Sequence, residues 1–325
     1  MTTSLLSKRS REFVPVRVAS SIPVLRDFRW SMYLRNAVTE RFRLYRAGGT
    51  ELKTSDLRRL SDAGITTVYL DASDYSGFQD QLRASLKQVV SDERFPLAQR
   101  FSVVNEVVRG VLRETFCRGN VDRAVEQTIE LADHVVDLVC RDDLIASELQ
   151  SVLHFDYSTF THSANVAYYT VMLAHALGHS DRAILTRIGT GALLHDIGKL
   201  GIPEPILSKP GRLSPVEWNV LRNHPALGLM SLKNQDPLEF GQLMMVYQHH
   251  ERIDGSGYPV RLAGNDIHEW ARICAVVDVF EALTSDRPYR RPLSTVAALE
   301  TIEQTDGRRL EPEYLQCWKT TISRT

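Results

Sequence analysis

The chain has 325 residues, of which 43% are hydrophobic and 24% are charged, proportions that are typical of a folded globular protein. Its 39 basic and 40 acidic residues give a formal net charge of -1, so no overall positive field attracts nucleic acid. No apolar run approaches the roughly 20 residues of a membrane span, and the polar N-terminus lacks the apolar core of a signal peptide. The four cysteines form no C-x-x-C pair, which excludes a zinc ribbon and favours a reducing compartment. We therefore expect a cytoplasmic protein that binds neither nucleic acid nor membranes.

Residues 1–95 predict a small α+β domain. Strands are predicted where apolar residues alternate or β-branched residues gather, at 12–19, 41–46 and 65–70. A short helix capped by Thr54 or Ser55 and an amphipathic helix at 75–92 complete the unit. No concentrated set of chemically active side chains occurs here. The region is either a folded module without chemistry or a regulatory domain that senses a signal or binds a protein partner.

Residues 96–150 predict a helical connector, because apolar residues recur at helical spacing on both sides of Gly119. Such a stripe is more often simple core than an interface, but it leaves a homodimer open. Residues 151–325 are nearly all helical in pattern, with short loops. The sequence thus predicts a mainly α fold in three parts: a small α+β domain, a connector and a C-terminal all-helical bundle.

Within the C-terminal part, long helices are predicted at 156–177 and 181–194. Ser214 begins a capping box with proline at the first helical position. That helix is expected to end before Pro225, which places His224 at its C-terminal end. A later helix, with a box-like cap that begins at Asp266, carries Asp278.

The adjacent pair His195 and Asp196 follows an apolar run, with Lys199 one turn later. Burying an unpaired carboxylate is expensive, so a cation or a metal is implied as its partner. Asp278 would also need such a partner if it were buried, because its neighbours on both sides are apolar. Alone, Asp278 would be interpreted as an exposed or salt-bridged residue.

The histidines are weak signals one by one. His249 and His250 at a helix end point about 100° apart, so they either reach two neighbouring metals or divide between core and surface. His224 could simply complement a helix dipole, and His162 is weaker still. Together they suit a binuclear site with nitrogen and oxygen ligands. The candidate ligands are His162, His195, Asp196, His224, His249, His250 and Asp278.

Mixed imidazole and carboxylate ligands suit iron, manganese or zinc. Two such metals that share a hydroxide activate water near neutral pH and neutralise a phosphoryl group during transfer. The residue pattern therefore predicts hydrolysis of a phosphate ester. The other five histidines have no partner at a recognisable spacing and are interpreted as structural.

Residues 151–325 resemble the HD-GYP domain, a branch of the HD phosphohydrolase superfamily. The matching motifs are H-D-I-G-K at 195–199, K-P-G-R-L at 209–213, H-H-E at 249–251, D-G-S-G-Y-P at 254–259, D-V-F at 278–280 and T-S-D-R-P-Y-R at 284–290. Their number and order make the resemblance specific for about half of the chain. The N-terminal region is similar, much more weakly, to the small module that often precedes such domains in bacteria.

The resemblance implies cyclic di-GMP phosphodiesterase activity in bacterial second-messenger signalling, with two divalent ions, iron or manganese. It implies metal-ligand roles for the seven candidates, with Asp196 bridging. Lys199 would stabilise charge on the scissile phosphate, and Tyr258 would shape the guanine-binding side. Arg287 and Arg290 would hold ligand phosphates; without the resemblance they would be interpreted as a solvated basic patch.

Two positions depart from the family pattern. Ser158 occupies the place where some members hold a third metal with glutamate, so two metals are predicted and linear pGpG rather than GMP could accumulate. Glu281 stands where aspartate is usual, and little effect is expected because the charge is kept. Two other interpretations remain open: hydrolysis of another cyclic dinucleotide or nucleotide, and a non-catalytic cyclic di-GMP receptor that acts through residues 1–95.

Overall fold

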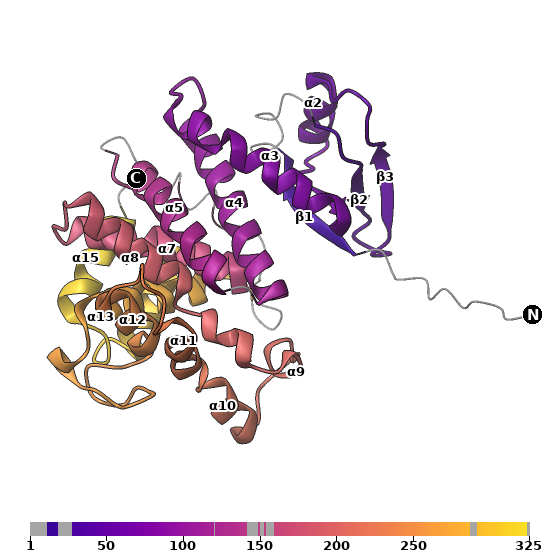
Figure 1. Ribbon diagram of the computed structural model, residues 1–325. Coiled ribbons are helices and arrows are strands. Elements are labelled where there is room, and N and C mark those ends of the chain that lie inside the picture. The colour runs from indigo at the N-terminus through magenta and orange to yellow at the C-terminus, as the bar shows by residue number, and fades with distance from the viewer. Residues whose placement is uncertain are drawn as a thin grey trace, which may run out of the picture. The chain divides into compact units, whose positions relative to one another are not determined.

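The computed structural model describes residues 12–18, 28–119, 121–141, 149, 153, 159–286 and 291–323. The chain divides into two compact units, residues 1–107 and 108–325 (Figure 1). Helix α4 (Leu97–Arg118) crosses the border between them. The division into 1–95, 96–150 and 151–325 stays a prediction.

The N-terminal unit contains an antiparallel four-stranded sheet in the order β1-β4-β2-β3. Its strands are β1 (Phe13–Arg17), β2 (Met32–Arg35), β3 (Phe42–Arg46) and β4 (Thr67–Asp71). Burial alternates along β1 and β4, so that one face joins the core, and helix α3 (Ala72–Ser91) packs against these two strands. The three predicted strands are confirmed. The sequence does not predict β2, because its four residues carry little periodic signal.

The predicted cap of the short helix is wrong. Helix α2 (Thr54–Asp62) includes Thr54 as its first residue, and Lys53 is the N-cap. The Asp56 side chain turns back to accept a hydrogen bond from the Lys53 backbone N–H at 3.0 Å. The first turn is therefore closed by a carboxylate inside the helix rather than by a hydroxyl before it.

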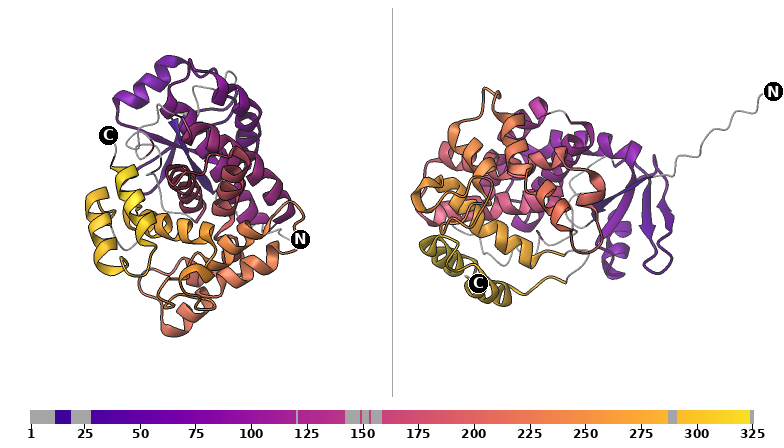
Figure 2. Two further views of the ribbon diagram at one scale, coloured as in Figure 1. Left: turned by 90° about the vertical axis from the view of Figure 1, so that its left-hand side faces the viewer. Right: turned by 90° about the horizontal axis from the view of Figure 1, so that it is seen from below.

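The C-terminal unit is a helical bundle, coloured magenta to yellow in Figure 2. Its central helix is α7 (Thr159–Ala176), in which residues 161–174 are all buried, as expected for a helix covered on every side. Packed with it or with one another are α5 (Val121–Val139), α8 (Arg182–Leu194), α12 (Phe240–Gln248) and α13 (Glu269–Thr284). Tyr169, Phe280 and Trp318 close the core with edge-on ring contacts of 5.2–5.6 Å.

Further elements connect and cover these helices. They are η2 (Ile197–Gly201), α9 (Glu204–Leu207), α10 (Pro215–Leu221), α11 (His224–Leu232), η3 (Gly264–Asp266), α14 (Thr295–Thr305) and α15 (Pro312–Ile322). The mainly α fold with a small α+β unit is thus confirmed. None of the described helices has both the length and the apolar composition needed to cross a bilayer.

Two sequence-based expectations about helix ends are wrong. His224 does not end α10; it begins α11, with Pro225 tolerated in the first helical turn. Asp266 does not cap α13. That role belongs to His268, whose Nδ1 accepts a hydrogen bond from the Trp270 backbone N–H at 3.1 Å. The capping box predicted at Ser214 is confirmed.

Gly198 allows η2 to pack directly on α11. A Cβ atom at this position would lie 1.9 Å from the His224 carbonyl oxygen and 2.4 Å from the Gly228 nitrogen. Both are backbone atoms, so no side chain could turn aside to make room. The glycine in H-D-I-G-K is therefore required by the contact between the two backbones.

The substitution Gly198→Ala should lower the free energy of unfolding by about 1–3 kcal/mol, as overpacking does. Gly201→Ala is the matched control, because its Cβ would meet only the end of the Leu227 side chain, at 2.9 Å. The free energies of unfolding of the two variants would be measured by denaturant unfolding and compared. Equal stability of the two variants would contradict the packing argument.

Candidate metal centre

Seven buried or partly buried side chains from five parts of the C-terminal unit converge at one place. His162 comes from α7, the adjacent His195 and Asp196 follow α8, and His224 begins α11. His249 and His250 follow α12, and Asp278 lies within α13. All seven candidate ligands predicted from the sequence are therefore brought together.

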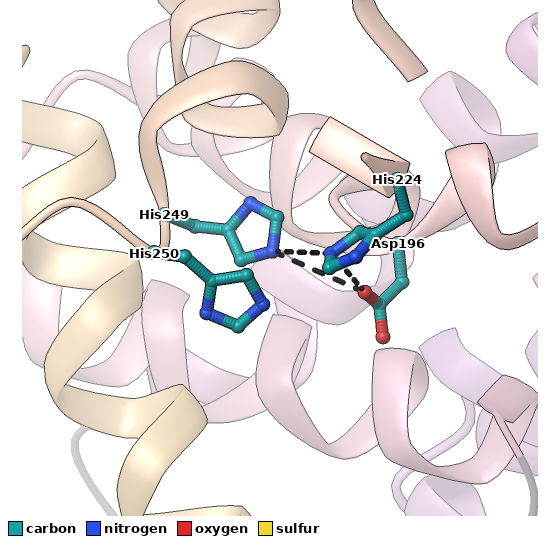
Figure 3. A group of neighbouring side chains, drawn as sticks. All are labelled: Asp196, His224, His249 and His250. Atoms are coloured by element: carbon teal, nitrogen blue, oxygen red, sulfur yellow. Dashed lines mark hydrogen bonds and ion pairs between the residues drawn. The ribbon is translucent and has the colours of Figure 1, made fainter. Parts of the chain in front are cut away.

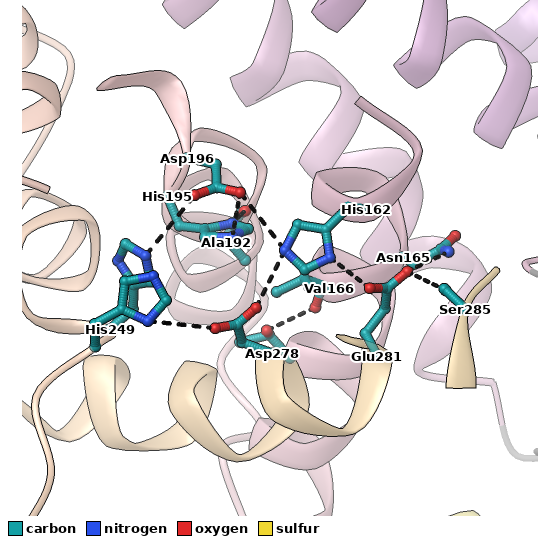
Figure 4. Close-up of polar contacts among 12 residues, drawn as sticks. His162, Asn165, Val166, Ala192, His195, Asp196, His249, Asp278, Glu281 and Ser285 are labelled. Carbon is teal, nitrogen blue, oxygen red and sulfur yellow. Dashed lines mark hydrogen bonds and ion pairs between the residues drawn. The ribbon is translucent and has the colours of Figure 1, made fainter. Parts of the chain in front are cut away.

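The side chains form two groups that could each hold a metal ion. The first group contains Asp196, His224, His249 and His250 (Figure 3). The second contains His162, His195 and Asp278 (Figure 4). His249 and His250 thus share a group, although the sequence left open whether they serve different metals.

Asp196 lies between the two groups. Its Oδ1 atom is 3.3 Å from Nε2 of His224 and 3.9 Å from Nε2 of His249. Its Oδ2 atom is 3.4 Å from Nε2 of His195 and 3.6 Å from Nε2 of His162. Each carboxylate oxygen therefore faces a different group, which is the geometry that a bridging ligand needs.

Asp278 makes a similar pair of contacts from the opposite helix. Its Oδ1 atom is 3.1 Å from Nε2 of His162, and its Oδ2 atom is 3.7 Å from Nδ1 of His250. Burial raises the pKa of Asp278, but the neighbouring His162 outweighs it and holds the pKa well below its ordinary value. The carboxylate is therefore ionised and available as a ligand.

Three histidines are oriented by hydrogen bonds to backbone carbonyls three residues earlier. The Nδ1 atoms of His195, His224 and His249 lie 2.7, 2.9 and 2.9 Å from the carbonyl oxygens of Ala192, Leu221 and Val246. A carbonyl only accepts, so Nδ1 carries the proton and the Nε2 lone pair faces the centre. Each of these rings thus presents the atom that a metal would bind.

Burial keeps several of these imidazoles neutral. It lowers the pKa of His224 to about 4, against the opposing effect of Asp196. Burial and neighbouring histidines hold the pKa of His249 and of His250 well below the ordinary value. A metal-ligating histidine must be neutral, so these three rings need lose no proton before binding.

His162 is held differently, by a carboxylate. Its Nδ1 contacts Oε2 of Glu281, while its Nε2 faces Asp196 and Asp278. Burial lowers the pKa of His162, but Glu281 and Asp278 together outweigh it and raise the pKa to about 9. Without a metal the ring holds a second proton on Nε2, and a metal bound at that atom would displace it.

The buried atoms without hydrogen bonds support a cation here. Within the described residues, Nε2 of His195 and Oδ1 of Asp196 are buried and accept no hydrogen bond of normal geometry. Leaving such acceptors unpaired is costly. Imidazole nitrogens and carboxylate oxygens around a shared carboxylate fit divalent ions such as iron, manganese or zinc.

Lys199 and Tyr258 lie at the edge of this centre. Nζ of Lys199 is 2.5 Å from Oδ2 of Asp196. Burial raises the pKa of Asp196, but Lys199 and His195 outweigh it, so the pKa stays well below its ordinary value. The Tyr258 ring stacks on His250 at 4.7 Å, and the Arg222 guanidinium lies over the same ring at 4.6 Å.

Glu251 has a role that the sequence did not reveal. Its Oε1 atom accepts hydrogen bonds from the backbone N–H groups of Val260 at 2.8 Å and Arg261 at 3.0 Å. This buried carboxylate therefore ties the G-Y-P loop to the end of α12 and positions Tyr258. The sequence offered H-H-E as a motif, but the partners of Glu251 are backbone atoms and carry no side-chain signal.

Three residues singled out in the sequence, Arg287, Arg290 and Ser158, lie outside the described residues.

Two of the histidines interpreted as structural make structural contacts. His268 caps α13, and Nε2 of His179 is 3.4 Å from Oε1 of Glu269.

Comparison with known proteins identifies relatives of this chain. The family model of the HD domain matches residues 141–314, just over half of the chain. A cyclic di-GMP phosphodiesterase of Pseudomonas aeruginosa is 32% identical over 291 residues, which cover 84% of this chain and 69% of that protein. A 3′3′-cGAMP-specific phosphodiesterase of Vibrio cholerae is 37% identical over 167 residues, which cover 51% of this chain and 35% of that protein.

A solved structure supports the fold. A protein of Bdellovibrio bacteriovorus, described as an HDG"Y"P protein, matches 95% of this chain and 99% of its own with a TM-score of 0.70. The sequence identity of 18% makes this a likeness of fold alone.

Three observations agree on the family of the chain. They are the HD-domain match, the long alignment with the Pseudomonas relative, and the H-D and G-Y-P motifs. The chain belongs to the HD-GYP family of HD-domain proteins.

Proposed function

We propose that the chain is a metal-dependent phosphodiesterase that hydrolyses cyclic di-GMP in bacterial signalling. The observation that carries the proposal is the arrangement of seven ligand side chains around Asp196, whose two oxygens face two separate ligand groups. The name of the Pseudomonas relative, aligned with 84% of this chain, supports cyclic di-GMP as the substrate.

The proposed centre holds two divalent ions, iron or manganese. When bound, such a pair lowers the pKa of a water molecule and neutralises charge on a phosphoryl group. Asp196 and Asp278 would hold both ligand groups together, and the neutral histidines would supply nitrogen ligands. Lys199 would place its ammonium group where negative charge develops on the phosphate. Tyr258, fixed against His250, would bound the guanine side.

The related Vibrio enzyme favours a second candidate substrate. Its name specifies 3′3′-cGAMP, which differs from cyclic di-GMP in one base. Base selection would depend on the loop that carries Tyr258 rather than on the metal ligands. A non-catalytic receptor role is a further alternative, and no candidate ligand is replaced in a way that favours it.

Other expectations remain predictions. These are phosphate binding by Arg287 and Arg290, the production of pGpG that follows from Ser158, a cytoplasmic location, a homodimer and a protein partner of residues 1–95. Each concerns residues or assemblies beyond the geometry of the described centre.

A hydrolysis assay tests the proposal. The protein would be purified without oxygen, loaded separately with iron and with manganese, and incubated with cyclic di-GMP or 3′3′-cGAMP before chromatography of the products. We expect faster hydrolysis of cyclic di-GMP, with pGpG as the main product. Asp196→Ala should abolish turnover, whereas Asp236→Ala, at an exposed aspartate before α12, should not. Full metal occupancy without hydrolysis of either dinucleotide would refute the enzymatic assignment.

Lys199→Ala should lower kcat by about 10²–10³-fold, as removal of one group that stabilises transition-state charge does. The bound metal should remain, because the ligand set is unchanged. Lys233→Ala, an exposed lysine at the end of α11, is the matched control and should behave like the unaltered protein. Unchanged kcat in Lys199→Ala, or loss of metal from it, would contradict the proposed role.

A further inference from the structure

His162 is distinguished from its neighbours by the group that holds its Nδ1 atom. His195, His224 and His249 use neutral carbonyls from their own chain segments. His162 uses the carboxylate of Glu281, 119 residues later in the chain and on a different helix. A carboxylate accepts hydrogen bonds and donates none when ionised, so it fixes the proton on Nδ1 and leaves Nε2 for the centre.

Glu281 is itself held in place. It is buried, and its Oε1 atom accepts hydrogen bonds from Nδ2 of Asn165 at 3.0 Å and from Oγ of Ser285 at 2.5 Å. The other oxygen, Oε2, is turned toward His162 (Figure 4). With two donors on one oxygen and the imidazole on the other, both carboxylate oxygens are needed at once.

We propose that Glu281 is a positioning residue that orients His162 and thereby sets the metal affinity of one ligand group, that of His162, His195 and Asp278. This inference rests on the proposed metal centre and deepens it. The Oε2 atom of Glu281 contacts His162, which belongs to this ligand group and not to the other. Loss of Glu281 should therefore weaken the binding of one ion and spare the other.

A purely structural role would predict something different. Glu281 also connects α13 to α7 through Asn165, so it could matter only for helix packing. In that case its loss would lower stability and weaken both ions together. The number of ions affected, and the dependence of the effect on His162, separate the two roles.

The test uses Glu281→Gln in the full chain. Glutamine has nearly the same shape, but its single carbonyl oxygen cannot accept hydrogen bonds from His162 and from the Asn165–Ser285 pair at once. Manganese titration with counting of bound ions would be compared among the unaltered protein, Glu281→Gln, His162→Ala and the double variant. Thermal unfolding of each metal-free protein would monitor the fold. Glu269→Gln, an exposed carboxylate on the same helix, is the matched control.

We expect Glu281→Gln to bind one of its two ions about 10–100-fold more weakly, the usual effect of removing a partner of a ligand. The double variant should bind no more weakly than His162→Ala, since the effect passes through that ring. Ser285→Ala, which keeps the carboxylate, should weaken the same ion to a smaller extent. Equal weakening of both ions, unchanged affinity, or full additivity with His162→Ala would overturn the inference.

The titration is independent of the substrate. If two ions bind and Glu281→Gln loses one, but no dinucleotide is hydrolysed, the positioning role stands and the proposed function fails. If hydrolysis is normal and Glu281→Gln keeps both ions at full affinity, the positioning role alone fails. A chain that binds no divalent ion would contradict both.

Discussion

The structure of the C-terminal unit depends on the burial of two ionised carboxylates, Asp196 and Asp278, at the centre of a helical bundle. Desolvation costs several kcal/mol for each carboxylate unless opposite charge or a metal compensates it. In the described part of the chain, Lys199 and His162 supply positive charge. A ring of imidazoles supplies further nitrogen atoms. The bundle is therefore arranged around a position where a cation is favourable and an apolar group is not.

The remaining features follow from the need to deliver nitrogen ligands to that position. Four of the five histidines lie at the end of a helix or directly after it. There the backbone turns, and a side chain can project inward. Gly198 lets η2 approach α11, which brings Asp196 and His224 within 3.3 Å of each other. Glu251 then fixes the loop that carries Tyr258 against the site. Local hydrogen bonds thus set the direction of His195, His224 and His249, and a long-range one sets that of His162, before any ion binds.

Much of this arrangement could be predicted from the sequence, because H-D, H-H and an aspartate among apolar residues are local signals. The helix-end position of His224 was predicted wrongly, since a proline in a first turn and a proline after a last turn look alike in sequence. The contacts of Glu281 could not be predicted from the sequence. Its partners His162 and Asn165 lie 119 and 116 residues away, and only the packing of α13 on α7 brings them together. Contacts of that kind have no periodic or spacing signal.

The central claim is that Asp196 joins two ions into one centre. Electron paramagnetic resonance of the anaerobically prepared, manganese-loaded protein tests it most directly, together with a count of bound ions. The account predicts two ions per chain and a spectrum of magnetically coupled manganese, because ions that share a carboxylate ligand lie close together. A spectrum of isolated ions, with one ion per chain, would contradict it.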